Sequence, residues 1–310
     1  MTENVVRIGT RKSALALWQA EWIKKRLSEL NPALHIELVK ITTKGDKIID
    51  SPLANIGGKG LFVKEIEEAL LEGRADIAVH SMKDMPAELP DGLIIGAVPE
   101  REDPFDALLI RGEILMHLRP GAIIGTSSLR RGAQLKKLRP DATIEPLRGN
   151  VDTRVRKLDE GQYDAVVLAV AGLKRMGLED RIVEYLGPPH FLPAVGQGAL
   201  AIQTRENDDS TNSLIAPLEH GPSRTTTAAE RAFLAELQGG CQVPIAAYAA
   251  HVGEKLHVAG MVASLDGSTI LRQDMEGDPS DAEEIGKTLG KKLLEKGADK
   301  ILEEIYGETK

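Results

Sequence analysis

The only cysteine of the chain, Cys241, lies in the segment Gly239-Gly240-Cys241-Gln242-Val243-Pro244. The two glycines let other groups approach the sulfur closely, and the proline stiffens the exit of the segment. A lone cysteine is commonly a small buried hydrophobe, whereas one on an exposed glycine-shaped loop can be a nucleophile or an attachment point. Position alone leaves both interpretations open, so the partners of Cys241 must decide.

Positive charge is concentrated in one stretch: residues 125–157 hold nine arginines and lysines against three acidic residues, in a chain of net charge −8. Arg130 and Arg131 follow Thr126-Ser127-Ser128, which is predicted to open a helix, where free N–H groups favour an anion and disfavour a lone cation. Arg148 and Arg154 recur at the next predicted strand-to-helix turn. Paired N–H groups of arginine suit carboxylates or phosphates, so these four residues predict an anion site. The remaining cations fit a solvated helix face: Lys136, Lys137, Arg139, Arg156 and Lys157.

Further candidates come earlier in the chain. Arg11 and Ser13 lie at the first strand-to-helix turn, and Lys59 lies in the glycine-rich segment Gly57-Gly58-Lys59-Gly60. That segment lacks the residue order of a nucleotide P-loop, so it is weak support for phosphate binding.

Lys83 and Asp84 follow an apolar strand that ends at His80. Asp84 is the one carboxylate among these cations; it either caps the turn before Met85-Pro86 or serves as an acid, a base or a counter-charge. His80, at the end of an apolar strand, is more typical of a packed and hydrogen-bonded core residue.

Composition limits the classes of function. Aromatic residues make up 3% of the chain, and the net charge is negative, which argues against a nucleic-acid binder. A single cysteine excludes an internal disulfide, and the N-terminal residues lack an apolar signal core. We therefore expect a soluble cytoplasmic protein. No group of His, Cys, Asp and Glu has metal-ligand spacing, so no metal is expected.

The elements that position these residues alternate between strand and helix. Strands are predicted at 5–9, 35–42 and 76–80, and helices after Ser13, over 61–71 and over 225–237. Ser13 is predicted to be the N-cap of the helix that follows it. Strands and helices that alternate indicate a parallel or mixed α/β sheet. In the first helix one face is predicted to be buried: Leu15, Trp18, Trp22, Leu27 and Leu30.

A second α/β unit is predicted from about Pro104. Residues 123–126 resemble 6–10, and 160–167 resemble 72–79, which indicates two similar lobes. Two such lobes would leave a ligand cleft at the carboxyl ends of their strands. Alternating strands over 246–275 and helices over 281–306 predict a small C-terminal α+β domain.

Several of these segments together resemble the hydroxymethylbilane synthase (porphobilinogen deaminase) family, from about Arg7 to Met275. The resemblance rests on seven motifs: Lys44-Gly45-Asp46, Gly57-Gly58-Lys59-Gly60-Leu61-Phe62, Val79-His80-Ser81-Met82-Lys83-Asp84-Met85-Pro86, Gly125-Thr126-Ser127-Ser128-Leu129-Arg130-Arg131, Leu147-Arg148-Gly149-Asn150-Val151-Asp152-Thr153-Arg154, Pro193-Ala194-Val195-Gly196-Gln197-Gly198-Ala199-Leu200 and the Cys241 segment. It implies two α/β lobes like those of periplasmic binding proteins with an active-site cleft between them, plus a small C-terminal α+β domain. The implied domains are 1–99 with 200–218, 104–194 and 222–310.

By this resemblance the chain joins four porphobilinogen molecules head to tail with release of ammonia, and then hydrolyses the linear hydroxymethylbilane off its primer. The primer is a dipyrromethane cofactor held through a thioether to Cys241. Asp84 matches the catalytic carboxylate, which is expected to bind pyrrole N–H groups and to stabilise a cationic azafulvene as ammonia leaves. A monomer without nucleic-acid or membrane partners is expected.

The resemblance also assigns two sets of binding residues. Those implied for the cofactor are Lys83, Thr126, Ser128, Arg130, Arg131, Arg148, Gly149 and Arg154. Those implied for the incoming substrate are Arg11, Ser13, Gln19, Lys59, Phe62, Arg175 and Gln197. The alternative from another class is a non-catalytic, two-lobed cytoplasmic binding protein for a polycarboxylate ligand.

Overall fold

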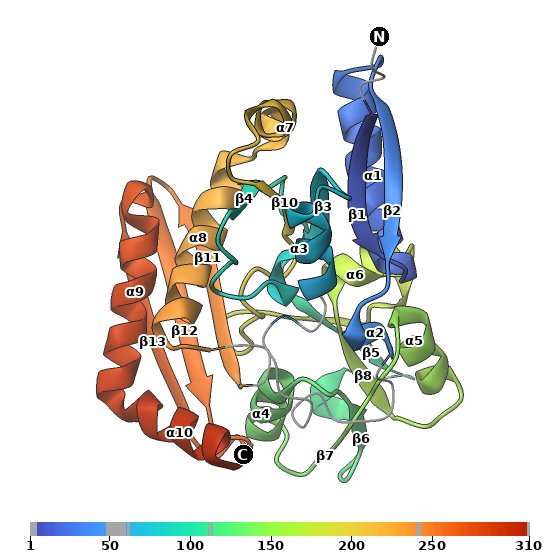
Figure 1. Ribbon diagram of the computed structural model, residues 1–310. Coiled ribbons are helices and arrows are strands. Elements are labelled where there is room, and N and C mark those ends of the chain that lie inside the picture. Colours follow the sequence, from blue (N-terminus) through green and yellow to red (C-terminus); the bar gives the residue numbers. More distant parts are fainter. Residues whose placement is uncertain are drawn as a thin grey trace. The chain divides into compact units, whose positions relative to one another are not determined.

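The computed structural model describes residues 5–47, 60, 63–110, 112, 114–239 and 243–308 (Figure 1). The described chain divides into two compact units. The first combines the described residues before 103 with 199–224, and the second combines 103–198 with the described residues from 225 onward. The three predicted domains and the cleft between the lobes stay predictions.

The first unit is built on a five-stranded sheet of order β2-β1-β3-β10-β4. β1 is parallel to β2 and β3, whereas β10 runs antiparallel to β3 and β4. Its strands are β1 (Val5–Arg11), β2 (His35–Ile41), β3 (Ile77–Ser81), β4 (Leu93–Ala97) and β10 (Leu200–Arg205). Its α-helices are α1 (Ala14–Leu30), α2 (Lys44–Lys47), α3 (Lys64–Leu71) and α7 (Asp209–Ile215), with the start of α8 (Gly221–Glu236).

Both faces of this sheet are covered, as the alternation of side chains along β3 shows. Ile77 and Val79 pack in the cluster that includes α1, whereas Ala78 packs with α3 on the other face. The predicted buried face of α1 is correct for Leu27, which is fully buried, and for Trp22, which packs against the core. It is wrong for Trp18 and Leu30, which are 39% and 54% exposed, whereas Ala16, Ala20 and Ile23 are buried. Small residues at i and i+4 let the helix lie close to the sheet, and Trp18 and Leu30 lie off this buried face.

The second unit contains a sheet of order β7-β6-β8-β5-β9. Its strands are β5 (Asp106–Ile110), β6 (Ile123–Gly125), β7 (Thr143–Glu145), β8 (Ala165–Ala169) and β9 (Glu184–Leu186). Its helices are α4 (Leu129–Leu138), α5 (Val151–Asp159) and α6 (Val170–Arg175). α4 packs on one face and α5 with α6 on the other.

The two sheets have the same order and the same strand directions. β6 is parallel to β7 and β8, and β5 is antiparallel to β8 and β9. β6 takes the place of β1, and β8 that of β3, so the two resemblances seen along the sequence fall on equivalent strands. The hint of two similar lobes is thereby confirmed.

The second unit also holds a three-stranded antiparallel sheet, β11 (Ile245–Val252), β12 (Lys255–Ala263) and β13 (Ile270–Gly277). One face packs on α8, α9 (Ala282–Leu293) and α10 (Asp299–Glu308). The other face contributes Ala246 and Met261 to a cluster with Ala133 of α4. The predicted fold class, two α/β lobes with a small C-terminal α+β domain, is confirmed.

Candidate active site

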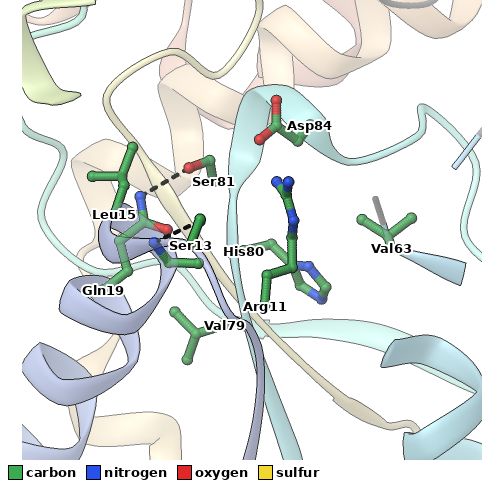
Figure 2. A pocket seen from close by; sticks show the side chains of 10 residues that line it. Arg11, Ser13, Leu15, Gln19, Val63, Val79, His80, Ser81 and Asp84 are labelled. Carbon is green, nitrogen blue, oxygen red and sulfur yellow. Dashed lines mark hydrogen bonds between the residues drawn. The ribbon is translucent and has the colours of Figure 1, made fainter. Parts of the chain in front are cut away.

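A pocket lies in the first unit at the carboxyl ends of β1 and β3 (Figure 2). It is lined by Arg11, Ser13, Leu15, Ala16, Gln19, Val63, Val79, His80, Ser81 and Asp84. Four predicted site residues, the catalytic candidate and three of the substrate set, therefore share one pocket. Open α/β sheets bind ligands at this edge because the strand ends leave polar turns around a hollow.

Asp84 is held by the backbone on both sides of it. It ends the 3-10 turn η2 (Met82–Asp84), which follows β3 directly. The N–H of Met82 donates to the carbonyl of Ala199 at 3.0 Å, and the N–H of Met85 donates to that of Met82 at 3.1 Å. Both methionines are buried. The backbone of the partly buried Asp84 is thus fixed beside the pocket. Figure 2 shows the guanidinium end of Arg11 pointing toward Asp84.

Gln19 and Ser13 are fixed by local hydrogen bonds. Gln19 is buried, and its Nε2 donates to the Oγ of Ser81 at 2.8 Å (Figure 2). Ser13 is the N-cap of α1, as predicted, and its Oγ accepts from the N–H of Ala16 at 3.3 Å. The cap uses the oxygen of Ser13 as an acceptor and leaves its hydroxyl hydrogen to donate.

His80 is a packed core residue, as predicted, and it belongs to a buried chain of polar groups. Its Nε2 lies 3.0 Å from the Oε1 of Gln203, whose Nε2 donates to Glu67 at 2.9 Å. An amide that donates to Glu67 presents its oxygen to His80, so His80 carries its proton on Nε2. Burial, aided by the positive charge of Arg11, lowers the pKa of His80 to about 4. His80 is therefore neutral at pH 7, while burial raises the pKa of Glu67.

The first predicted arginine turn lies in the second unit, at the start of α4. Ser128 is the N-cap, and its Oγ accepts from the N–H of Arg131 at 3.4 Å. The Oγ1 of Thr126 accepts from the N–H of Ser128 at 3.2 Å. Thr126, Ser128 and the two arginines are thus brought together at one helix N-terminus, where the helix dipole favours an anion.

Arg130 and Arg131 are each 5% exposed and share one carboxylate, that of the fully buried Asp106 at the start of β5. Arg130 Nη1 lies 2.7 Å from Asp106 Oδ2, and Arg131 Nη2 lies 2.6 Å from Oδ1. Burial opposes the ionisation of Asp106, but the two guanidinium groups outweigh it and hold the pKa of its carboxyl well below the usual value. Asp106 was not predicted from the sequence, because it lies outside the basic stretch 125–157 and no charge pattern along the chain links it to the arginines.

The second arginine turn brings Arg148, Gly149 and Arg154 together at the start of α5. The Nε of Arg154 donates to the carbonyl of Gly149 at 2.8 Å. Gly149 has a φ of 111°, and a Cβ there would lie 2.7 Å from the side chain of Thr153. Only glycine fits this turn, which lets the backbone between the two partly buried arginines stay compact.

Arg175 and Gln197 have buried contacts within the second unit. Arg175 Nη2 donates to the carbonyl of Gly198 at 2.7 Å. Gln197 is 1% exposed, and its Nε2 donates to Asp106 Oδ1 at 3.0 Å and to the carbonyl of Pro104 at 2.8 Å. Their predicted role in substrate binding stays a prediction.

Three predicted site residues, Lys59, Phe62 and Cys241, lie outside the described residues. Lys83 lies in η2 beside Asp84 and is partly buried. The prediction for Arg139 was wrong: it is 6% exposed, pairs with Asp141 at 2.6 Å and donates to the carbonyls of Leu115 and Leu118.

Two family models match the chain. One, described as porphobilinogen deaminase, dipyromethane cofactor binding domain, matches residues 6–213, and the other, porphobilinogen deaminase, C-terminal domain, matches residues 225–295. The chain belongs to the porphobilinogen deaminase family. The family resemblance predicted from the motifs is therefore confirmed.

Relatives of this family are similar over nearly the whole chain. The porphobilinogen deaminase of Syntrophotalea carbinolica is 54% identical over 97% of this chain and 96% of its own length. That of Syntrophobacter fumaroxidans is 53% identical over 99% of both. Among solved structures, the methionine-binding protein MetQ has a TM-score of 0.44 at 15% identity over 69% of this chain and 89% of its own, too distant to transfer a ligand.

The residues present fit the dipyrromethane cofactor of the family. Two pyrroles that each carry an acetate and a propionate bring several carboxylates into one place. The described chain offers arginines at two neighbouring turns, a capped helix N-terminus, and a buried arginine pair with a single counter-charge. In the described ranges no three His, Cys, Asp or Glu residues are grouped as metal ligands, and no helix there is long and apolar enough to cross a membrane.

Proposed function

We propose that Asp84, Cys241 and the two arginine turns are the working parts by which this chain carries out the reaction of its family. The chain is a transferase, a hydroxymethylbilane synthase, which condenses four porphobilinogen molecules in turn with release of ammonia and then releases the linear tetrapyrrole by hydrolysis. The single observation that carries the assignment of roles is the pocket that holds Asp84 together with Arg11, Ser13 and Gln19.

Asp84 is the catalytic carboxylate of this proposal. Loss of ammonia from porphobilinogen leaves a cationic azafulvene, and a fixed carboxylate stabilises that cation and bonds pyrrole N–H groups. Arg11, on the other wall of the pocket, binds a substrate carboxylate. Neutral His80 donates its Nε2–H to Gln203 rather than to the pocket. His80 therefore adds no positive charge to the pocket that holds Asp84.

The dipyrromethane supplies the nucleophilic pyrrole carbon from which the chain grows. The second unit holds its carboxylates through Arg130, Arg131, Arg148 and Arg154, with Thr126 and Ser128 at the helix N-terminus. We assign Lys83 and Gly149 to the same cradle, and Lys59, Phe62, Arg175 and Gln197 to the substrate side. A lost arginine leaves a ligand carboxylate unpaired, which costs binding.

Cys241 is the proposed attachment point, through a thioether. The sulfur forms the S–C bond with the azafulvene that loss of ammonia leaves, and the thiol proton is released. We further propose that the enzyme works in the cytoplasm as a monomer. Its net charge of −8 supports the absence of a nucleic-acid partner.

The test of the covalent cofactor is the intact mass of the denatured, purified protein, followed by a peptide map. The expected result is an excess of two linked pyrrole units on the peptide that contains Cys241. A sample without excess mass is incubated with porphobilinogen and weighed again. If no pyrrole mass appears on a folded sample, or if it appears on another peptide, the assignment to Cys241 fails.

A further inference from the structure

We propose that Asp106 is a positioning residue of the cofactor site: it holds Arg130 and Arg131 side by side with one unit of positive charge left for a ligand carboxylate. This inference rests on the proposed function of the two arginines. Asp106 does not touch the ligand; it acts through the guanidinium groups that do.

The contacts place both arginines on one carboxylate. Nε and Nη2 of Arg131 donate to Asp106 Oδ1 at 2.9 and 2.6 Å, and Nη1 donates to the carbonyl of Val167 at 3.0 Å. Nη1 of Arg130 donates to Asp106 Oδ2 at 2.7 Å and to the carbonyl of Leu192 at 2.7 Å. Each oxygen of Asp106 thus serves one arginine, and the two guanidinium planes have fixed directions.

The charge of this cluster is unbalanced. Two guanidinium groups and one carboxylate sum to one positive charge, and the cluster lies at the N-terminus of α4, where the dipole already disfavours cations. Burial lowers the pKa of Arg130, so the surroundings oppose its charge. Without Asp106 two adjacent cations would be buried together, whereas with it the cluster holds a single excess charge that an anion can neutralise.

The arginines differ in what they can offer that anion. The Nε and Nη2 edge of Arg131 already donates to Asp106. Arg130 uses only Nη1 and lies over the ring of Phe191 at 5.9 Å. Among the described residues, Nε and Nη2 of Arg130 make no hydrogen bond to a protein acceptor, so this edge of the guanidinium is left for a ligand. That edge can receive a carboxylate through two parallel hydrogen bonds.

Asp106 is itself anchored by the segment that precedes β10. Gln197 donates to Asp106 Oδ1 at 3.0 Å. The neighbouring Gly196 donates its N–H to the fully buried Glu230 of α8 at 2.7 Å, and Glu230 also accepts from Ala249 of β11 at 2.8 Å. The carboxylate is therefore fixed through Gln197 to the core of the C-terminal part of the chain.

The first sheet shows what this position holds when no arginine pair is present. Asp106 opens β5 opposite Ala169, the last residue of β8, and Leu200 opens β10 opposite Ser81, the last residue of β3. The two positions are equivalent, and Leu200 is a 2%-exposed apolar residue. The fold thus accepts an apolar side chain here, so the carboxylate at 106 serves the arginines and is no requirement of the strand.

The test compares Asp106→Asn and Asp106→Glu with Asp76→Asn as a matched control. Asp76 also bridges two arginines, Arg7 at 2.8 Å and Arg205 at 3.4 Å, but at the amino end of β3. Each variant is purified without porphobilinogen, its Tm is measured, and its gain of pyrrole mass after addition of porphobilinogen is followed by mass spectrometry well below its own Tm.

We expect Asp106→Asn to lose mass gain entirely and Asp106→Glu to gain mass about 100-fold more slowly than wild type, because one extra methylene shifts the arginines by about 1 Å. Asp76→Asn should lower Tm and gain mass at the wild-type rate. If Asp106→Asn does not fold, Asp106→Glu decides, and a wild-type rate in that variant overturns the inference.

Two other outcomes also overturn it. Folded Asp106 variants that gain mass normally, alongside an Arg130→Leu variant that does not, would leave the cradle standing and remove Asp106 from it. If Asp76→Asn also gains pyrrole mass slowly, and the loss of rate in all variants follows their loss of Tm, then Asp106 contributes only to general stability. If Arg130→Leu itself gains mass like wild type, the proposed cradle fails, which is a different result.

Discussion

The two α/β sheets share one strand order, yet they treat ionisable side chains at their carboxyl edge in different ways. In the first sheet Arg11 and Asp84 line a pocket, and neither is fully buried. In the second, Arg130 and Arg131 are almost completely buried on Asp106. One edge thus presents charges to a pocket, and the other fixes charges inside the protein.

This difference follows from single positions. Where the second sheet has Asp106 at the start of its antiparallel strand, the first has Leu200. A buried cation needs a counter-charge, so a pair of buried arginines is possible only in the sheet that has the carboxylate. The carboxylate of the first lobe, Asp84, instead lies on a short turn beyond the strand, where it can face a substrate.

The largest expected effect is on turnover, and it comes from changing Asp84, the carboxylate that faces the pocket, rather than the buried Asp106. Asp84→Asn keeps the shape of the side chain and loses its charge, so turnover should fall by about 10²–10⁴-fold while the free energy of unfolding stays near wild type. Steady-state rates and urea unfolding check both halves, with the exposed Asp91→Asn as control. Near-normal turnover would remove Asp84 from the mechanism.

The next variants separate a buried arginine from a partly buried one. Arg131→Leu should lose cofactor and also roughly 3–5 kcal/mol of unfolding free energy, because it leaves the buried Asp106 short of a partner. Arg148→Leu should impair cofactor assembly or chain elongation with little change in stability. The exposed Arg156→Leu is the control, and normal tetrapyrrole formation by both test variants would disprove the cradle.

The buried histidine of the first lobe predicts a pH dependence. The unfolded chain binds a proton at His80 near pH 6.5, but the folded protein does so only near pH 4, because burial lowers this pKa. Stability should therefore fall as the pH drops from about 6.5 to about 4, by up to roughly 3 kcal/mol from this residue.

The measurement is urea unfolding of wild type and His80→Gln at several pH values, since glutamine keeps a donor toward Gln203. The difference between the two curves isolates His80 from Glu67, whose raised pKa acts in the opposite direction. Parallel curves between pH 6.5 and pH 4 would show that His80 does not resist protonation.

The smallest expected effect tests the equivalence of the two turns. Ser13 and Ser128 cap α1 and α4 with bonds of 3.3 and 3.4 Å to the N–H three residues on. Ser13→Ala and Ser128→Ala should each lower the unfolding free energy by about 1 kcal/mol. Thermal or urea unfolding measures both, and clearly unequal losses would show that the caps are not equivalent.

Local patterns predicted much of the fold. The cap at Ser13, the alternation of strands and helices and the two internal resemblances needed only neighbouring residues, and all were confirmed. The buried face of α1 was predicted only in part, since hydrophobicity favours tryptophan while close packing against a sheet favours alanine. Arg139 was missed because its partners include backbone carbonyls at 115 and 118, which no charge pattern reveals.

The sequence by itself determined the family, the chemistry of its motifs and the residues that could carry it, because those depend on residue types in order along the chain. Only the tertiary structure decided that Arg130 and Arg131 share Asp106, that Gln197 supports it, and that His80 is neutral with its proton on Nε2. These states depend on burial and on partners 24 to 123 residues away in the chain. Desolvation and hydrogen-bond geometry exist only once the strands are paired.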